Sequence, residues 1–278
     1  MDSDKDTIQC FNNRREDITP RTIFLKFIST SLSLQDHKGI KHDNQPMTTD
    51  SATQSTTQPS TIFRHLFLLL NSLAVFCIIT VIYWSYSYLE GFHFLKSRKT
   101  RFNWHPLLLS VGLLFLFGNG LLTFRILTGF PRKSVKLTHL VINGVAALMA
   151  ILGLFVVFVF HFGQGFSNLY SLHSWIGLLT VILFEGNFLV GFWVFYYGKC
   201  PPWIRSLVLP YHTFLGVSMI ALIVGSFITG LSEKALFVKY GDGLVYSDLP
   251  PQALIINILG VAIVIWGLIC ALLVTQRV

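Results

Sequence analysis

Residues 137–161 read LTHLVINGVAALMAILGLFVVFVFH, an apolar stretch with one histidine near its start, another at its end and no charged residue between them. An α-helix of 25 residues is roughly 37 Å long, which exceeds the ~30 Å hydrocarbon core of a bilayer. The stretch therefore predicts a helix that crosses a membrane.

Five further segments of this kind lie at residues 64–89, 104–127, 171–196, 207–231 and 253–274. Hydrophobic residues make up 53% of the 278-residue chain and charged residues only 12%, and the mean hydropathy of +0.61 is high for a soluble domain. Helices satisfy their backbone polar groups internally, as lipid requires, and short connections make neighbouring spans antiparallel. We therefore predict an all-α membrane protein with six transmembrane helices within residues 63–278.

Residues 1–62 have a different composition, and MTTDSATQSTTQPST at 47–61 is of low complexity. We predict that they form a disordered N-terminal tail. The net charge of +8 comes from Lys and Arg in the loops, which fits membrane topology and anionic substrates, so no nucleic-acid partner is expected. Eight basic residues flank the spans on the side of the termini and six on the other, which favours cytosolic termini.

Four of the nine histidines lie a few residues inside the start of successive apolar stretches. They are His105 in FNWHPLLL, His139 in KLTHLVIN, His173 in LYSLHSWIG and His212 in LPYHTFLG. The spacings of 34, 34 and 39 residues are close to one span plus one turn. In an antiparallel bundle, His105 and His173 therefore lie near one membrane face, and His139 and His212 near the other.

A histidine inside hydrocarbon calls for a partner helix, a water cavity, a proton path or a metal. Two imidazoles that face each other across a bundle have the axial geometry of a six-coordinate haem iron, whereas zinc needs four ligands at one point. Glycines fall at matching helical angles: Gly177 and Gly191 near the azimuth of His173, and Gly216 and Gly230 near that of His212. These glycines fit either haem slots or ordinary helix packing.

From Phe102 to Val278 the chain resembles the cytochrome b561 family of ascorbate-dependent transmembrane oxidoreductases. The matching pieces are FNWHPLL (102–108), LLTFR (121–125), KLTH (136–139), NLYSLHSWIG (168–177), LPYH (209–212) and GLSEKALF (230–237), of which NLYSLHSW is highly specific. The chain departs from the pattern of the family at three places. It has TFR where YR is frequent, Trp104 where Leu is usual, and Glu185 in the middle of a span.

The resemblance implies two b haems in a central four-helix bundle formed by the second to fifth spans. His105 and His173 would bind the iron of the non-cytosolic haem, and His139 and His212 that of the cytosolic haem. The implied reaction moves electrons from cytosolic ascorbate to monodehydroascorbate or ferric chelates on the other side of an endomembrane vesicle or the plasma membrane. A homodimer is the candidate assembly.

A cytosolic ascorbate site is implied at Arg132, Lys136 and Arg205, since convergent cations attract a monoanion. Without the resemblance, these residues would be interpreted as a positive-inside anchor. Arg125 matches a partner for a haem propionate, and a snorkelling arginine explains it almost as well.

The non-cytosolic acceptor site is implied at Phe160, His161 and Tyr170. His161 can exchange a proton near neutral pH, and a solvated interfacial histidine is the competing interpretation.

Two other functions use the same residues. The first is a proton or solute transporter in which the four histidines and Glu185 are titratable groups. The second is an electron-relay subunit that depends on a partner reductase rather than on ascorbate. By helical angle Glu185 lies about 120° from His173, which argues against a haem contact and favours a protonated, hydrogen-bonded carboxyl group.

Overall fold

The computed structural model describes residues 60–93, 98–241 and 243–276. The predicted disordered tail lies outside the described residues up to position 59, and the first described helix begins at Thr61.

Six helical segments of the described chain are long and apolar enough to cross a membrane. They are α3 (Thr61–Tyr88), the combined segment α5 (Trp104–Leu109), η1 (Ser110–Leu116) and α6 (Phe117–Ile126), then α7 (Arg132–Gln164), α8 (Leu172–Gly191) with η2 (Phe192–Tyr196), α9 (Pro202–Phe237) and α10 (Pro251–Thr275). Two short helices, α4 (Arg98–Arg101) and η3 (Tyr246–Asp248), lie in connections. The prediction of an all-α protein with six membrane-length helices is confirmed.

Two of the helices are longer by at least eight residues than the apolar pattern predicted. Helix α7 has 33 residues and α9 has 36, because both continue into polar sequence beyond their apolar centres. Pro202 occupies the first turn of α9, where its missing N–H costs nothing, and Gly165 ends α7 in the left-handed conformation at φ 70°.

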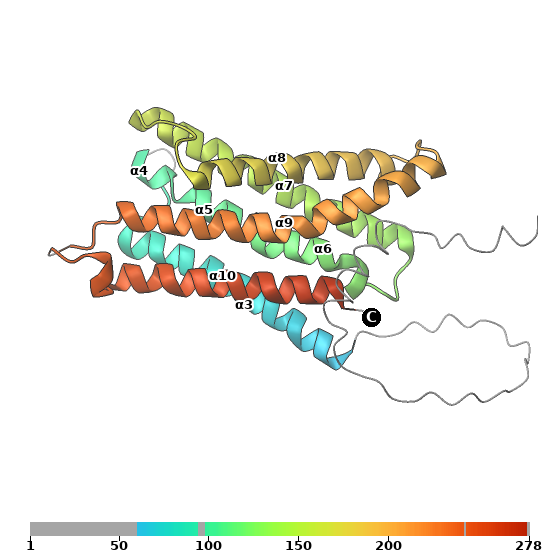
Figure 1. Cartoon of the computed structure of the whole chain (residues 1–278), viewed down its shortest axis with the longest axis horizontal. Coiled ribbons are helices and arrows are strands. Elements are labelled where there is room, and N and C mark those ends of the chain that lie inside the picture. Colours follow the sequence, from blue (N-terminus) through green and yellow to red (C-terminus); the bar gives the residue numbers. More distant parts are fainter. Residues whose placement is uncertain (1–59, 94–97, 242, 277–278) are drawn as a thin grey trace, which may run out of the picture. The chain divides into compact units, whose positions relative to one another are not determined.

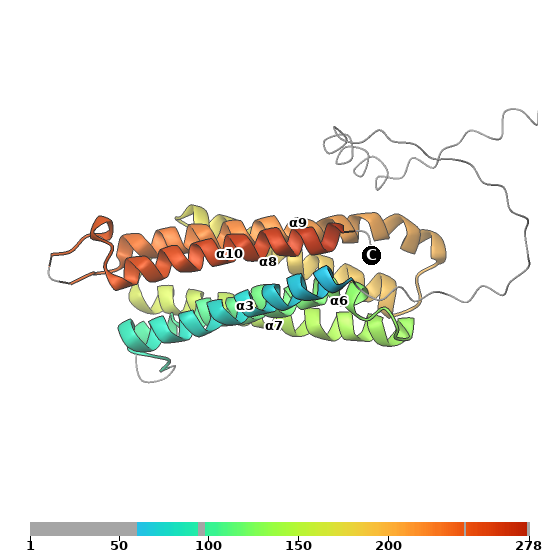
Figure 2. The ribbon, with the colours of Figure 1, turned by 90° about the horizontal axis from the view of Figure 1, so that it is seen from below.

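The second to fifth spans form the centre of the bundle, with α3 and α10 packed beside them (Figure 1). Helix α8 packs on α9, and α7 packs on α5, η1 and α6, while α10 contacts both α3 and α9. Seen from below, α9 and α10 lie in one layer and α3, α6 and α7 in another (Figure 2).

The bundle has two ends that differ in the residues they carry. We call the end with the first turns of α7 and α9 the basic end, defined by Arg132, Lys136 and Arg205 (Figure 1). The opposite end, which holds the C-terminal end of α7 and the start of α8, is the far end. Helix α3 starts and α10 finishes at the basic end, as an even number of spans requires.

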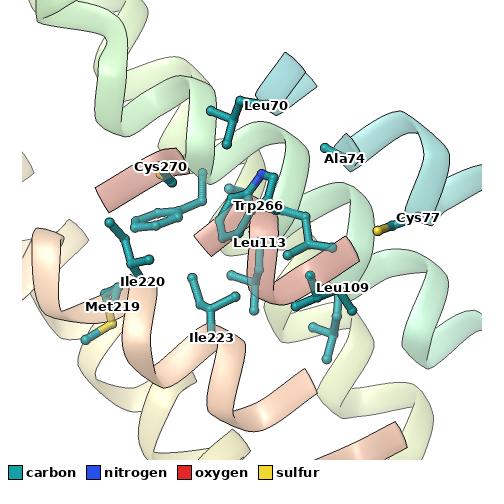
Figure 3. Close-up of a cluster of buried hydrophobic side chains, with 14 of the residues drawn as sticks. Leu70, Ala74, Cys77, Leu109, Leu113, Met219, Ile220, Ile223, Trp266 and Cys270 are labelled. Atoms are coloured by element: carbon teal, nitrogen blue, oxygen red, sulfur yellow. The ribbon is translucent and has the colours of Figure 1, made fainter. Parts of the chain in front are cut away.

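Trp266 on α10 is fully buried at the centre of the apolar cluster drawn in Figure 3. A Cβ atom added at Gly118 would lie 3.0 Å from its ring, and one at Gly267 would lie 2.6 Å from a methyl group of Val224. Because apolar burial gains little between helices in lipid, such close packing is what stabilises the association. Glycine on one helix opposite a large side chain on the next therefore holds α10 against the bundle.

Helix irregularities flank two of the four histidines. The π-helical segment η1 separates His105 from the glycines of α6, and π-helical turns are frequent at functional sites. Pro210 lies inside α9, two residues before His212, and has no N–H for the carbonyl of Ser206. Helix α9 bends in its N-terminal half (Figure 1).

Replacing Trp266 with Ala leaves a cavity between α10 and the bundle, so we expect the free energy of unfolding to fall by about 3 kcal/mol. Leu268→Ala is the matched control, because Leu268 is on the same helix but 67% exposed. Thermal unfolding of the purified variants in detergent measures both effects. Equal losses for the two variants would contradict the packing role of Trp266.

Candidate functional site

The first histidine pair lies at the far end of the bundle, between α5 and α8. The ring centroids of His105 and His173 are 6.1 Å apart, and the ring planes make an angle of 86°. The Nδ1 atom of His105 lies 2.9 Å from the carbonyl oxygen of Gly153 on α7, and that of His173 lies 2.9 Å from the carbonyl of Ser226 on α9. A carbonyl can only accept, so each Nδ1 carries the hydrogen and each Nε2 keeps a free lone pair.

The second pair, His139 and His212, lies at the basic end. Its ring centroids are 6.4 Å apart and its planes make an angle of 71°. His139 donates from Nδ1 to the carbonyl of Gly120 at 2.8 Å. In the described structure, the Nδ1 atom of His212 is buried and has no hydrogen-bond partner. The structure thus forms both of the pairs that the topology predicted.

The spacing of the paired rings fits one metal ion between two imidazoles. A metal–nitrogen bond of roughly 2 Å on each side, together with half the width of each ring, places the two centroids about 6 Å apart. The two histidines of each pair could therefore both bind one haem iron.

Two glycines make room for the imidazole rings. A Cβ atom at Gly230 would lie 2.8 Å from Cε1 of His173, and one at Gly191 would lie 2.7 Å from Cε1 of His212. The helical angles had grouped Gly191 with His173 and Gly230 with His212, each on its own helix. The structure adds the contacts between the two helices: α8 and α9 are antiparallel, and Gly191 and Gly230 each face the histidine of the other helix.

A cavity of about 660 Å³ opens beside His139 and His212. Its volume is within the range of ~300–1,000 Å³ that is usual for sites of small molecules and cofactors. Its wall is mostly aromatic and aliphatic, and its cationic side chains are Arg125, Arg132, Lys136 and Arg205. The four basic residues selected from the sequence therefore meet at one cavity.

These cations are held in different ways. Arg132 and Lys136 are exposed, whereas Arg205 is partly buried and donates to the carbonyl of Gly198 at 3.0 Å. Arg125, in the last turn of α6, donates to the carbonyl of Gln276 near the end of α10. The cavity therefore has both exposed surface cations and guanidinium groups that are hydrogen-bonded to the main chain.

Aromatic rings link His105 to the residues predicted for an acceptor site at the far end. Phe102 lies 5.9 Å from His105 and 5.2 Å from Phe160, and the ring of Phe160 is 5.8 Å from that of His161, all measured between centroids. Phe160 and His161 are thus brought close to the first histidine pair. Phe102 begins the motif FNWHPLL, and no role was predicted for it.

Tyr170 is instead part of a hydrogen-bonded group with Glu233. The hydroxyl of Tyr170 donates to one carboxylate oxygen of Glu233 at 2.7 Å, and the hydroxyl of Ser171 donates to the other at 2.8 Å. Ser171 is also the N-cap of α8, so Glu233 ties the start of α8 to the last turns of α9. Glu233 was not predicted to have a role, although it lies in the motif GLSEKALF. A carboxylate near the end of an apolar span was the feature of the sequence that could have indicated one.

The environment of Tyr170 changes its acidity. Desolvation of the hydroxyl, its hydrogen bond to the Glu233 carboxylate and repulsion between the two anions raise the pKa of Tyr170 to about 12. Tyr170 therefore remains a neutral hydrogen-bond donor at every physiological pH.

Glu185 lies in the middle of α8, partly buried, and one of its oxygens has no hydrogen-bond partner in the described structure. Its neighbours Phe184 and Asn187 line the cavity, and Glu185 does not. This placement agrees with the helical angle, which argued against a haem contact.

Residues 104–238 match the family described as eukaryotic cytochrome b561. A lysosomal membrane ascorbate-dependent ferrireductase of Homo sapiens is 37% identical over 204 residues, which cover 73% of this chain and 84% of the relative. A plasma membrane ascorbate-dependent reductase of Mus musculus is 33% identical over 213 residues, covering 75% and 72%. A transmembrane ascorbate-dependent reductase of Mus musculus is 34% identical over 180 residues, covering 65% and 71%.

We expect Glu233→Gln to lower the pKa of Tyr170 from about 12 toward the ordinary value of ~10, because the phenolate would no longer face a carboxylate. Ultraviolet titration of phenolate absorbance measures this, with the Tyr170→Phe protein subtracted to isolate the residue. Glu90→Gln, a change at an exposed carboxylate of the same end, should leave the titration unchanged. An unaltered Tyr170 titration in Glu233→Gln would refute the coupling.

Proposed function

The chain belongs to the cytochrome b561 family, and from this premise we propose that it is a transmembrane reductase that moves electrons from ascorbate at the basic end to an acceptor at the far end. The observation that carries the proposal is the presence of two facing histidine pairs, one toward each end of one bundle. Three of the four rings have Nδ1 bonded to a carbonyl, which leaves the lone pair of Nε2 free and would let it bind a metal.

The proposal includes two b haems. His105 and His173 would hold one, and His139 and His212 the other. When bound, each haem supplies reversible one-electron chemistry that no side chain of the bundle offers. The family is a cytochrome family, and the ring separations of 6.1 and 6.4 Å support a metal between the members of each pair.

The chain itself fixes the orientation of the ligands. The carbonyls of Gly153, Gly120 and Ser226 each hold one imidazole in a single tautomer, while Gly191 and Gly230 leave room for two of the rings. Such carbonyl partners also make the imidazole a more basic ligand.

At the basic end, Arg132, Lys136 and Arg205 would bind ascorbate. Ascorbate is an anion at neutral pH, so cations at the mouth of the cavity raise its local concentration, and a guanidinium adds directed hydrogen bonds. Two exposed cations and one fixed arginine at the same cavity support this assignment. We place the basic end in the cytosol, where the excess of Lys and Arg favours it.

At the far end, the acceptor would be monodehydroascorbate or a ferric chelate, bound near Phe160, His161 and Tyr170. The names of the relatives include both ferrireductases and reductases, which supports a ferric or organic acceptor. His161 can supply the proton that reduction of an organic radical consumes. Tyr170 can donate a hydrogen bond only if its bond to Glu233 is exchanged.

We expect purified protein to show the paired visible absorption bands of reduced b haem, and the variant His105→Ala with His173→Ala to lose about half of that absorbance because one of two binding sites is gone. Haem extraction and quantification per polypeptide checks the stoichiometry. His65→Ala, a change at an exposed histidine of α3, is the control and should keep full absorbance. Colourless protein, or an unchanged spectrum in the double variant, would refute the two-haem assignment.

With ascorbate trapped inside liposomes, we expect external ferricyanide to be reduced, and Lys136→Ala to lower kcat/KM for ascorbate by about tenfold through loss of one charged contact. Lys133→Ala is the matched control, because Lys133 is exposed on the same turn of α7 but does not line the cavity. Lack of reduction by ascorbate alone would favour a relay subunit or a transporter. Equal effects of the two lysine variants would exclude a specific role for Lys136.

A further inference from the structure

Lys234 contacts an aromatic ring that in turn neighbours His105 of the first histidine pair, and the sequence assigned this lysine to no site. Its Nζ atom is 5.1 Å from the centroid of the Phe102 ring, and this ring is 5.9 Å from His105. The ring centroid of Phe160 lies 5.2 Å from that of Phe102. The ammonium group of Lys234 thus shares an aromatic neighbour with a candidate haem ligand and with the predicted acceptor site.

This ammonium group has no anionic partner in the described part of the chain. The neighbouring carboxylate of Glu233 has both oxygens hydrogen-bonded to Tyr170 and Ser171. Lys234 is partly buried, and its described interaction is the one with the face of Phe102. A partly desolvated cation that rests on an aromatic ring is stabilised further when an anion completes its coordination.

The acceptor residues implied by the resemblance do not provide a permanent positive charge. Phe160 and Tyr170 are uncharged, and the imidazole of His161 is not a permanent cation as an ammonium or guanidinium group is. Lys234 supplies the charge that this set of residues lacks, at the aromatic group adjoining His105.

We propose that Lys234 is the anion-binding residue of the far-end acceptor site and that it selects acceptors carrying carboxylate or other anionic oxygen groups. The inference rests on the proposed function and specifies the class of acceptor. The ascorbate monoanion loses one electron and one proton at the basic end, becomes monodehydroascorbate and releases the proton to water. A ferric chelate held by Lys234 gains the electron and becomes ferrous.

The kinetic test uses the full chain in liposomes with ascorbate inside, which reports only molecules whose basic end faces inward. Lys234→Gln should raise KM for external ferric citrate by about tenfold, as expected for loss of a charged hydrogen bond. It should not raise KM for the cationic acceptor hexaammineruthenium(III). Lys234→Arg should restore most of the affinity for ferric citrate.

Lys239→Gln is the matched control, because Lys239 follows the same helix and is exposed. Its effect on KM for ferric citrate should stay below about twofold, as for a screened surface charge. The proposal is overturned if Lys234→Gln raises KM equally for the anionic and the cationic acceptor, or if the two lysine variants behave alike.

Two further measurements separate this inference from the proposed function. Binding of redox-inert gallium(III) citrate to protein in nanodiscs, in a Lys136→Ala background that weakens the basic end, should become about tenfold weaker with Lys234→Gln whether or not electrons flow. Unchanged binding overturns the proposal. If Lys234→Gln shifts the haem midpoint potential and leaves KM unchanged, the anion that Lys234 binds is a haem propionate. This result would also overturn the proposal.

Discussion

Hydrogen bonds from imidazole Nδ1 atoms to main-chain carbonyls of neighbouring helices are the constraint on which the bundle depends. A histidine in hydrocarbon must satisfy its ring N–H, and His105, His139 and His173 each do so with a carbonyl on another span. Each such bond fixes both the rotation and the height of two helices relative to each other. The bonds join the second span to the third and the fourth span to the fifth, whereas each facing pair takes one histidine from each of these two helix pairs. A cation-lined cavity lies next to one of the facing pairs.

The ring of His212 is positioned by packing rather than by a hydrogen bond of Nδ1. His212 has a buried Nδ1 without a partner in the described structure, and its ring packs closely against Gly191. Asn187 donates to the main-chain carbonyl of His212 at 3.3 Å, and Pro210, two residues before His212, lacks the N–H of one helical hydrogen bond. The two pairs are consequently not equivalent, although their ring separations are alike. The far-end pair has two carbonyl partners, whereas the basic-end pair has one and lies against a cavity.

The sequence predicted the six spans and the histidine pairs because both follow from chain-local quantities, namely apolar length and the spacing of residues along antiparallel helices. It did not predict which histidine each glycine contacts, since the contact of Gly191 with His212 depends on how α8 and α9 are rotated against each other. The bonds of Glu233 to Tyr170 and Ser171 were missed for the same reason, because they join residues more than 60 positions apart. The ends of α7 were also misjudged, since hydropathy marks where lipid contact stops and not where the helix stops.

The length of α7 has a consequence for access from water. Its 33 residues span about 50 Å, which is more than the ~40–45 Å of a bilayer with its headgroups. Arg132 and Lys136 lie at one tip and His161 at the other. A hydrophilic small molecule can therefore meet either tip from bulk solution without partitioning into lipid, so that the rate of encounter follows aqueous diffusion and ionic strength rather than the composition of the membrane.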